Sequence, residues 1–428
     1  MTIDHRSASA SLDALLREQT AEELRARLAP KNHPRPERIP GASRLSDADI
    51  DDRWQVLAHA SAAKQTLLDE TTLAAAATFA RNIENFVGTV KVPVGIAGPL
   101  RVNGTYAQGD FYVPLATTEA ALVASYNRGA LVISEAGGCT AILLHEGVTR
   151  APGFAFTTMA EAGEFVAWAV RAIDQLRAVA EATTRFGRMR DMRVNLDGNN
   201  VYLIFEFTTG EASGQNMVTI ATQALCQYIE THCPVRPRYW FIEANHSGDK
   251  KASQQSFLGG RGRSVTCECT VPRALVERIL HTTPEMMANY WRMSAVGGVL
   301  SGTIGVQGHY ANGLAAVYVA CGQDAACVAE SAVGVTRYEL TANGDLYASV
   351  TLPNLIVGTV GGGTSLPSQR ACLDILGLSG EGSANAFAEV CAGLSLAGEL
   401  SIVAAIVAGH FTSAHAKLAR GVSDSDRA

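Results

Sequence analysis

The feature that most constrains the fold is an alternation of strand and helix patterns between residues 152 and 242. Apolar periodicity predicts, in order, a strand at 154–156, a helix at 160–182, strands at 190–196 and 201–207, a helix at 216–232 and a strand at 239–242. An Asp-Gly turn joins the two middle strands and is typical of a β-hairpin. The order β-α-β-β-α-β predicts a ferredoxin-like domain over residues 152–242.

A chain of 428 residues is too long for one ordinary core, so two or three domains are expected. The flanking segments 86–151 and 243–428 are predicted to form one large α/β-type domain into which the ferredoxin-like domain is inserted. Residues 1–85 read as a helical segment interrupted by a proline-rich linker near residues 30–40. The fold class predicted is therefore α+β.

Composition excludes several classes of protein. A net charge of −6 argues against a nucleic-acid-binding surface. The nine cysteines lie singly in apolar segments, which is typical of buried thiols in a reducing cytoplasm. No apolar signal segment opens the chain, and the apolar run at 394–411 contains Glu399, so it is predicted as a buried core helix rather than a membrane span.

Two adjacent lysines, Lys250 and Lys251, follow a polar His-Ser-Gly-Asp turn and precede a Gly-Gly-Arg-Gly-Arg run. Paired lysines on such a turn usually form a solvated surface loop. They can also form a cation site for an oxyanion or carboxylate, because ammonium groups stabilise developing negative charge where water is excluded. The sequence around the lysines leaves both readings open.

Three other polar sites are equally ambiguous. Glu119 is expected in the first turn of a helix at 120–130, capped by Thr117 or Thr118, where a carboxylate is ordinarily a cap. Asp324 closes an apolar helix, so it is either well partnered or functional. Thr184 and Arg185 form a basic turn that holds a phosphate or is simply solvated.

Two glycine-containing loops can approach a ligand. Residues 208–216 lie between a strand and a helix, where glycines often create an anion site, but the dinucleotide fingerprint GxGxxG is absent. Residues 358–364 carry three consecutive glycines without a following lysine, so they are no P-loop and serve a ligand or a turn. His410 and His415 are five residues apart and do not share a helix face, so no metal site is predicted.

Taken together, these motifs resemble the 3-hydroxy-3-methylglutaryl-CoA reductase family over residues 84–420. The stretches that carry the resemblance are ENFVG, PVGIAGPL, PLATTEAALVASYNRG, EGVTRAP, SGDKKAS, GRGRSV, CGQDAA, GTVGGGTSLP and AGELSIVAAIVAGHFTSAH. The SGDKK loop is similar to that of the class I branch, here as a catalytic domain without a membrane region.

The resemblance implies that a thioester is reduced by two successive hydride transfers from a nicotinamide cofactor, which gives mevalonate and free coenzyme A. Lys250 would stabilise the carbonyl oxygen, and Asp324 would pair with that lysine. Glu119 would be the general acid of the aldehyde step, which requires a raised pKa. His415 would protonate the departing thiolate, a role suited to an imidazole, while His410 would be structural.

The resemblance also implies the binding residues. The substrate would be held by Ser125, Asn127 and Arg128 at coenzyme A, by Arg150 and Lys251 at the terminal carboxylate, and by Asn245 and Asn312. The cofactor would be NADPH, with Thr184 and Arg185 at its 2′-phosphate and with Glu211, Gly214, Asn216, Gln323, Gly361, Gly362 and Gly363 lining its site. Catalytic residues from two subunits make a homodimer obligatory, and dimers of class I commonly pair into homotetramers.

Three positions depart from the family pattern. Glu211 stands where the cofactor loop usually begins with aspartate, and Glu243 stands where a serine usually helps to bind the substrate carboxylate. Gly421 replaces a regulatory serine of animal members, so that phosphorylation switch should be missing. Glu243 suggests, as an alternative, a same-fold oxidoreductase for a different acyl-CoA. A non-catalytic acyl-CoA-binding or nucleotide-binding protein is a third reading.

Overall fold

The computed structural model describes residues 4–17, 19–31, 37–41, 44–380 and 382–409. His410, His415 and Gly421 lie outside this part of the chain. Contacts between Cα atoms divide the chain into two compact units, Met1–Thr89 and Val90–Ala428. Each unit is described by itself.

The first unit is helical. Its elements are α1 (His5–Leu16), α2 (Ala21–Leu28), α3 (Asp47–Val56), η1 (Ala58–Ala60), α4 (Ala63–Leu67), α5 (Glu70–Ala74) and η2 (Ala76–Phe79). Ser46 and Asp49 form a capping box at the start of α3, which satisfies backbone N–H groups that the helix leaves unpaired. The buried Arg53 guanidinium donates to the carbonyl oxygens of Pro40 and Phe86 at 3.1 and 3.0 Å, and so ties the linker to the helices.

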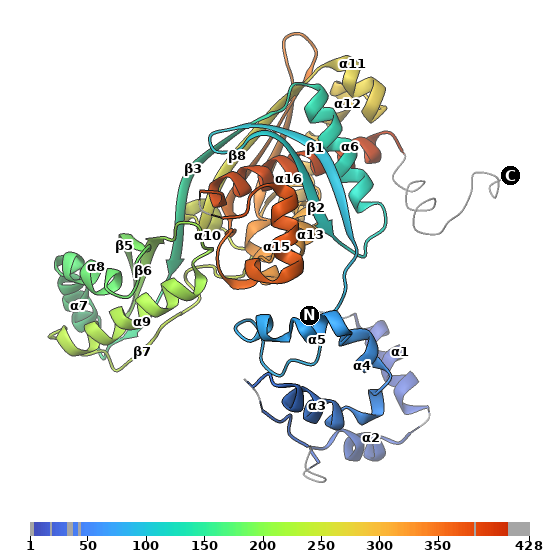
Figure 1. Ribbon diagram of the computed structural model, residues 1–428. Helices are drawn as coiled ribbons and strands as arrows, with labels where there is room; N and C mark the ends of the chain where they lie inside the picture. The colour runs from blue at the N-terminus through green and yellow to red at the C-terminus, as the bar shows by residue number, and fades with distance from the viewer. Residues whose placement is uncertain (1–3, 18, 32–36, 42–43, 381, 410–428) are drawn as a thin grey trace. The chain divides into compact units, whose positions relative to one another are not determined.

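The second unit contains one eleven-stranded sheet (Figure 1). Its strands are β1 (Val94–Gly104), β2 (Gln108–Ala116), β3 (Cys139–Arg150), β4 (Gly153–Ala155), β5 (Arg188–Asp197), β6 (Asn200–Thr208), β7 (Tyr239–Phe241), β8 (Gly262–Val271), β9 (Gly305–Val306), β10 (Gly334–Leu340) and β11 (Leu346–Leu355). The main path runs β7-β4-β6-β3-β8-β11-β10-β9, with β1 between β2 and β3, and β5 beside β6. The long strand β3 belongs to both halves of the sheet, because it pairs with β8 along most of its length and with β6 at its end.

The second unit also contains long helices, short helices and single helical turns. They are α6 (Leu122–Glu135), α7 (Met159–Arg171), α8 (Ile173–Glu181), α9 (Gln215–His232), α10 (Gln255–Gly259), α11 (Arg273–Leu275), the π-turn η3 (Val276–Leu280), α12 (Pro284–Ser301), α13 (Tyr310–Ala320), η4 (Ala325–Cys327), α14 (Val328–Ser331), η5 (Gly362–Ser365), α15 (Pro367–Leu376) and α16 (Ala384–Val407). Strands and helices are both abundant, so the predicted mixed α+β class is confirmed.

The predicted succession of elements between β4 and β7 is observed, with the first long helix broken at Ala172 into α7 and α8. The four strands lie in the order β7-β4-β6-β5. Alternate residues of β6 (Val201, Leu203, Phe205 and Phe207) are buried with apolar residues of α7, α8 and α9 in a core of their own. The alternation in the sequence therefore reflects one face of β6 packed against helices.

Helix α16 is the centre of the larger core. Figure 1 shows it beside the broad sheet, and it contacts β1, β3, β8 and β11 together with α6 and α13. It is the one helix of the described chain that is long and apolar enough to cross a membrane, but 83% of its most apolar window is buried inside the protein. All nine cysteines are free and buried, as the sequence predicts.

Two helix predictions were wrong in their bounds. Helix α6 begins at Leu122 after Ala121, whose φ of 69° precludes an earlier helical turn, so Glu119 lies in a loop and neither Thr117 nor Thr118 caps the helix. The apolar spacing of residues 272–291 also predicts one continuous helix, but this stretch is split, because His281 has a φ of 56° and ends the π-turn η3. A new helix, α12, then starts after Thr283 and continues to Ser301.

Candidate active site

Lys250 and Asp324 form an ion pair, with 2.8 Å between the ammonium Nζ and the carboxylate Oδ2. Lys250 comes from the loop that follows β7, and its backbone is held at a φ of 56° by a hydrogen bond from its N–H to Glu330 at 3.1 Å. Asp324 precedes η4, where its Oδ1 accepts a hydrogen bond from the Ala326 N–H. The pair therefore joins two turns that are 74 positions apart.

The pair shifts the pKa of both members in the direction of the charged form. The hydrogen bond to Asp324 raises the pKa of Lys250 above its usual value. Burial tends to raise the pKa of Asp324, but hydrogen bonds from Lys250 and from the Ala326 N–H outweigh burial, so this pKa is lowered. Both side chains are partly exposed, at 44% and 40%, so a ligand can reach the ammonium.

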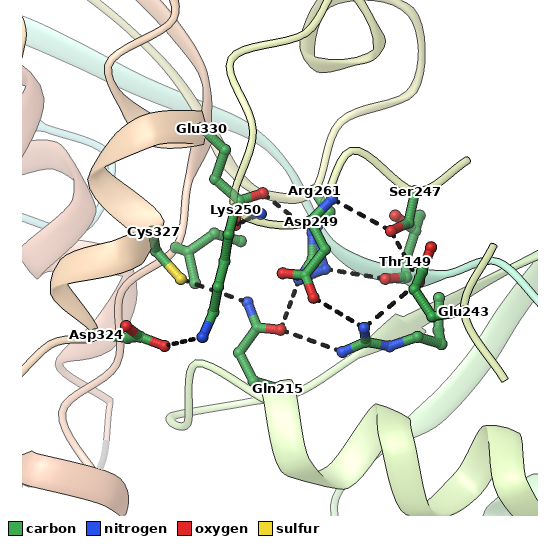
Figure 2. Close-up of polar contacts among 12 residues, drawn as sticks. Thr149, Gln215, Glu243, Ser247, Asp249, Lys250, Arg261, Asp324, Cys327 and Glu330 are labelled. Atoms are coloured by element: carbon green, nitrogen blue, oxygen red, sulfur yellow. Dashed lines mark hydrogen bonds and ion pairs between the residues drawn. The ribbon is translucent and has the colours of Figure 1, made fainter. Parts of the chain in front are cut away.

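A buried ion cluster lies behind Lys250 (Figure 2). The guanidinium of Arg261, 2% exposed, donates to Glu330 Oε2 at 3.0 Å, to Asp249 Oδ1 at 2.8 Å and to the carbonyl oxygen of Thr149 at 3.0 Å. Glu330 is fully buried, and burial raises its pKa despite the charge of Arg261. Because Asp249 directly precedes Lys250, this cluster fixes the turn from which Lys250 extends.

Arg150 forms the other side of the cluster. Its NH1 group lies 2.8 Å from Asp249 Oδ2 and 3.4 Å from Glu243 Oε2. Gln215 Oε1 accepts hydrogen bonds from Arg150 at 3.4 Å and from Arg261 at 2.6 Å, and so connects the two guanidinium groups. Glu243, which differs from the family pattern, thus faces Arg150, the cation that was expected to bind a substrate carboxylate.

Glu119 is held by Asn312. The Nδ2 atom of Asn312, in the first turn of α13, lies 3.1 and 2.9 Å from the two carboxylate oxygens. The Glu119 N–H donates to the Thr117 hydroxyl at 3.0 Å, which fixes the loop before α6. No hydrogen bond joins this pair to Lys250 or Asp324 within the described residues.

The three residues expected at coenzyme A are on α6, and α16 supports two of them. Ser401 accepts a hydrogen bond from Arg128 Nε at 3.1 Å, lies 2.9 Å from the Ser125 hydroxyl and offers its carbonyl oxygen to Arg128 at 2.7 Å. Burial lowers the pKa of Arg128. Asn127 Oδ1 accepts from the Gly98 N–H at 3.0 Å, so its amide is oriented toward the loop within β1.

Two other expected substrate residues line one pocket. A cavity of about 620 Å³ lies between the β5–β6 hairpin and the lysine loop, and both Asn245 and Lys251 border it. Lys251 donates to the carbonyl oxygen of Asp249 at 2.8 Å. The ammonium groups of the adjacent lysines therefore have different partners.

The loops expected at the cofactor converge. Gly358 packs so closely on residues 211–213 that an added Cβ would lie 2.5 Å from the Ser213 nitrogen, and its N–H donates to Gln323 Oε1 at 2.8 Å. An added Cβ on Gly322 would lie 2.4 Å from the Gly363 carbonyl oxygen. Only glycine at 358 and 322 allows the loop at 358–363 to approach residues 211–213 and Gly322 so closely.

The carboxylate of Glu211 has hydrogen-bond partners within the protein. Its Oε2 accepts from the Ala384 N–H at 2.8 Å, at the start of α16, and lies 3.3 Å from the Thr359 hydroxyl. The extra methylene of glutamate therefore reaches a helix N-terminus, where a carboxylate is favoured. Gly214 has a φ of 79° and precedes α9, and Asn216 is exposed in the first turn of that helix.

Thr184 and Arg185 form an exposed turn after α8. The Thr184 hydroxyl accepts from the N–H groups of Phe186 and Gly187 at 3.3 and 3.1 Å, which is a local side-chain turn. The guanidinium of Arg185 has no polar partner among the described residues. Gly361 and Gly362 are also open, since an added Cβ would meet nothing within 4 Å.

Sequence reasoning missed the buried ion cluster. Glu330 stands alone among apolar residues and small alanines, and a charge in such a segment is buried only with partners, which is a signal that could have indicated it. Gln215 and Arg261 gave no local signal, since Gln215 is the first residue of α9 and Arg261 stands in the Gly-Gly-Arg-Gly-Arg run, directly before β8. No group of three or more metal-ligating side chains occurs in the part of the chain described.

Comparison with known families decides what this scaffold is. The sequence profile of the family described as hydroxymethylglutaryl-coenzyme A reductase matches residues 49–420. The chain belongs to this family. The resemblance seen in the motifs is therefore confirmed over most of the chain.

Curated hydroxymethylglutaryl-coenzyme A reductases of archaea are similar throughout this region. The chain is 47% identical to the 3-hydroxy-3-methylglutaryl-coenzyme A reductase of Pyrococcus horikoshii over 348 residues, which cover 79% of this chain and 84% of the relative. It is 46% identical to that of Haloferax volcanii over 344 residues, which cover 79% of this chain and 85% of the relative. At this identity the two proteins and this chain share a family over most of their lengths.

The fold is also that of solved members of the family. A class II 3-hydroxy-3-methylglutaryl-CoA reductase from Streptococcus pneumoniae, bound to NADPH in open conformations, aligns with a TM-score of 0.63 at 21% identity. The alignment covers 83% of this chain and 97% of that one. The TM-score at this coverage indicates a shared fold, although the sequence identity is low.

Proposed function

We propose that this chain reduces 3-hydroxy-3-methylglutaryl-CoA to mevalonate and coenzyme A, with NADPH as the reductant in two successive hydride transfers. The single observation that carries the proposal is the ion pair between Lys250 and Asp324, at 2.8 Å, in which the turn of Lys250 is fixed by a buried ion cluster. An accessible ammonium on a rigid support suits a carbonyl that becomes an oxyanion.

Lys250 donates a hydrogen bond to the thioester carbonyl oxygen and stabilises the negative charge that develops on it. Asp324 keeps the ammonium protonated, because it raises the pKa of Lys250. Asp324 also directs the Nζ atom, since a lysine side chain is otherwise free to rotate. The pair therefore supplies both the charge and its orientation.

Glu119 is the general acid of the aldehyde step, and Asn312 orients its carboxyl group through contacts at 2.9 and 3.1 Å. His415 protonates the departing thiolate; it lies outside the described residues, so this role comes from its motif alone. Arg150 and Lys251 bind the substrate carboxylate, and Ser125, Asn127, Arg128 and Asn245 bind the rest of the acyl-CoA.

NADPH supplies the hydride when bound, and the residues of this chain suit such a group. The Arg185 guanidinium is exposed and free of polar partners in the described chain, as a 2′-phosphate site requires. Gly361 and Gly362 leave their backbone open to close approach, with φ of 80° and 55°. Thr184, Glu211, Gly214, Asn216, Gln323 and Gly363 shape the same site, Glu211 by fixing its loop.

A homodimer completes the catalytic group, because Glu119 and Lys250 have no contact within the described chain. The outer face of α12 supports an apolar contact between subunits, since Met293, Val299 and Leu300 are 77–83% exposed. The dimers pair into a homotetramer, and the protein is cytoplasmic. The inserted domain at 152–242 is the cofactor-binding domain, and Gln323 and Gly361–Gly363 of the large domain complete its site. Segments 86–151 and 243–428 form the large domain for substrate binding and dimerisation.

Oxidation of NADPH in the presence of 3-hydroxy-3-methylglutaryl-CoA tests the proposal. We expect loss of absorbance at the nicotinamide band, two NADPH per mevalonate formed, and much weaker activity with NADH. Activity only with another acyl-CoA would favour the same-fold oxidoreductase suggested by Glu243. Binding of acyl-CoA without oxidation of either cofactor would favour a non-catalytic binding protein.

A further inference from the structure

The carboxylate of Glu243 contacts Arg150, the cation that is proposed to bind the terminal carboxylate of the substrate. Glu243 Oε2 lies 3.4 Å from Arg150 NH1, and it accepts hydrogen bonds from the Ser247 hydroxyl at 2.9 Å and from the Ala151 N–H at 3.3 Å. In Figure 2 its carboxylate lies on the Ser247 side of the cluster, on the other side from Lys250. Three donors therefore hold one oxygen of Glu243 in place.

The positive charge of Arg150 already has carboxylate partners before any ligand arrives. Arg150 and Arg261 face the carboxylates of Glu243, Asp249 and Glu330, so the two guanidinium groups have three anionic partners. Asp249 holds both arginines at 2.8 Å and cannot leave without releasing Arg261. Glu243 has the longer contact with Arg150 and no contact with Arg261.

The second carboxylate oxygen of Glu243 lacks a hydrogen-bond donor among the described residues. Glu243 Oε1 is buried without a hydrogen-bond partner among the described residues, and so is the Nε atom of Arg150. A buried carboxylate oxygen without a donor is unfavourable. The contact between Glu243 and Arg150 is therefore incomplete on both sides and open to exchange.

We infer that Glu243 is a specificity-determining residue that weakens the binding of a terminal carboxylate at Arg150. This inference rests on the proposed function, in which Arg150 and Lys251 hold the carboxylate of the acyl group. A carboxylate that enters must displace Glu243 from Arg150 and then lies beside its charge. Repulsion between two carboxylates in a partly buried site lowers affinity for the charged acyl group relative to an uncharged one.

Kinetics with two acyl-CoA substrates and two variants test the inference. Glu243→Gln keeps the shape and removes the charge, and Glu243→Ser also removes the bulk. Each variant is expected to lower KM for 3-hydroxy-3-methylglutaryl-CoA by about tenfold or more, with kcat within about twofold of the wild type. KM for 3-hydroxy-3-methylbutyryl-CoA, which lacks the carboxylate, should stay unchanged or rise.

Glu206→Gln is the matched control. Glu206 is on β6, opposite Thr149 of β3, and its side chain is 16% exposed against 20% for Glu243. It lies 3.4 Å from His145 rather than from Arg150. It should leave both KM values as in the wild type. Thermal unfolding followed by circular dichroism shows whether each variant is folded under the assay conditions.

The outcomes separate this inference from the proposed function. Turnover of 3-hydroxy-3-methylglutaryl-CoA with the same KM in the wild type, Glu243→Gln and Glu243→Ser overturns the inference and leaves the proposed function standing. An equal fall in KM for both substrates also overturns it, since the effect would not depend on the carboxylate. Turnover of neither substrate by any of the three proteins contradicts both.

Discussion

The ammonium of Lys250 lies 2.8 Å from the carboxylate of Asp324, although each residue belongs to a different turn of the chain. The Lys250 N–H is bound to Glu330, which also accepts from Arg261. The position of the accessible Lys250 ammonium thus depends on the buried charges of Glu330 and Arg261. The predictions below follow from this arrangement and from the sites around it.

Replacement of Lys250 by alanine should lower kcat strongly, because the ammonium that stabilises the carbonyl oxygen is removed. Loss of one group that stabilises an oxyanion costs about 10²–10³ in kcat. Steady-state NADPH oxidation measures the loss, and calorimetry with coenzyme A measures binding, which should be retained. Retained turnover in Lys250→Ala would refute the assigned role.

Asp324→Asn should move the basic limb of the pH–rate profile to lower pH. Asp324 raises the pKa of Lys250, so its removal lets the ammonium lose its proton at lower pH. Since the protonated form is the active one, activity is lost earlier as pH rises. A kcat profile from pH 8 to about 12 checks this, because the basic limb of the wild type lies above the ordinary pKa of lysine. An unchanged basic limb would mean that Lys250 is not the titrating group.

Glu119→Gln should slow the reduction of a supplied aldehyde by about 10²–10⁴, because proton donation is lost while the shape is kept. Asn312→Ala should cost less, about tenfold, since it removes only hydrogen bonds that orient a charged group. Single-turnover assays with the aldehyde as substrate compare the two. A larger effect of Asn312→Ala than of Glu119→Gln would contradict the order of roles.

Arg185→Ala should raise KM for NADPH by about tenfold or more and leave KM for NADH unchanged, because only NADPH carries the 2′-phosphate. Arg171, exposed at the end of α7, is a control from the same 152–242 segment and should affect neither cofactor. An equal effect of Arg185→Ala on both cofactors would remove this residue from the phosphate site.

Glu330→Ala should lower the free energy of unfolding by about 3–5 kcal/mol, because it leaves the buried Arg261 with one carboxylate fewer. Asp174→Ala breaks an exposed pair with Arg177 and should leave the denaturation midpoint unchanged. Urea denaturation followed by circular dichroism gives both values. A midpoint for Glu330→Ala equal to that of the wild type would show that the cluster is not held by this carboxylate.

The sequence by itself determined the family and most of the strands and helices. Strand and helix periods are local, so the β-α-β-β-α-β succession between β4 and β7 could be read directly, as could the buried cysteines. Long motifs in a fixed order identified the family without any contact information. Local signals failed where the backbone is unusual, as at Ala121 and His281, because a positive φ leaves no mark in apolar periodicity.

Only the tertiary structure decided which charges meet. Arg261 and Glu330 are 69 positions apart, and Arg150 and Glu243 are 93 apart, so no spacing in the sequence relates them. Their pairing depends on β3, β8 and the loops between them being brought together, and burial then makes each charge require a partner. For the same reason, the sequence showed that Glu243 departs from its family, and the fold showed that it faces Arg150.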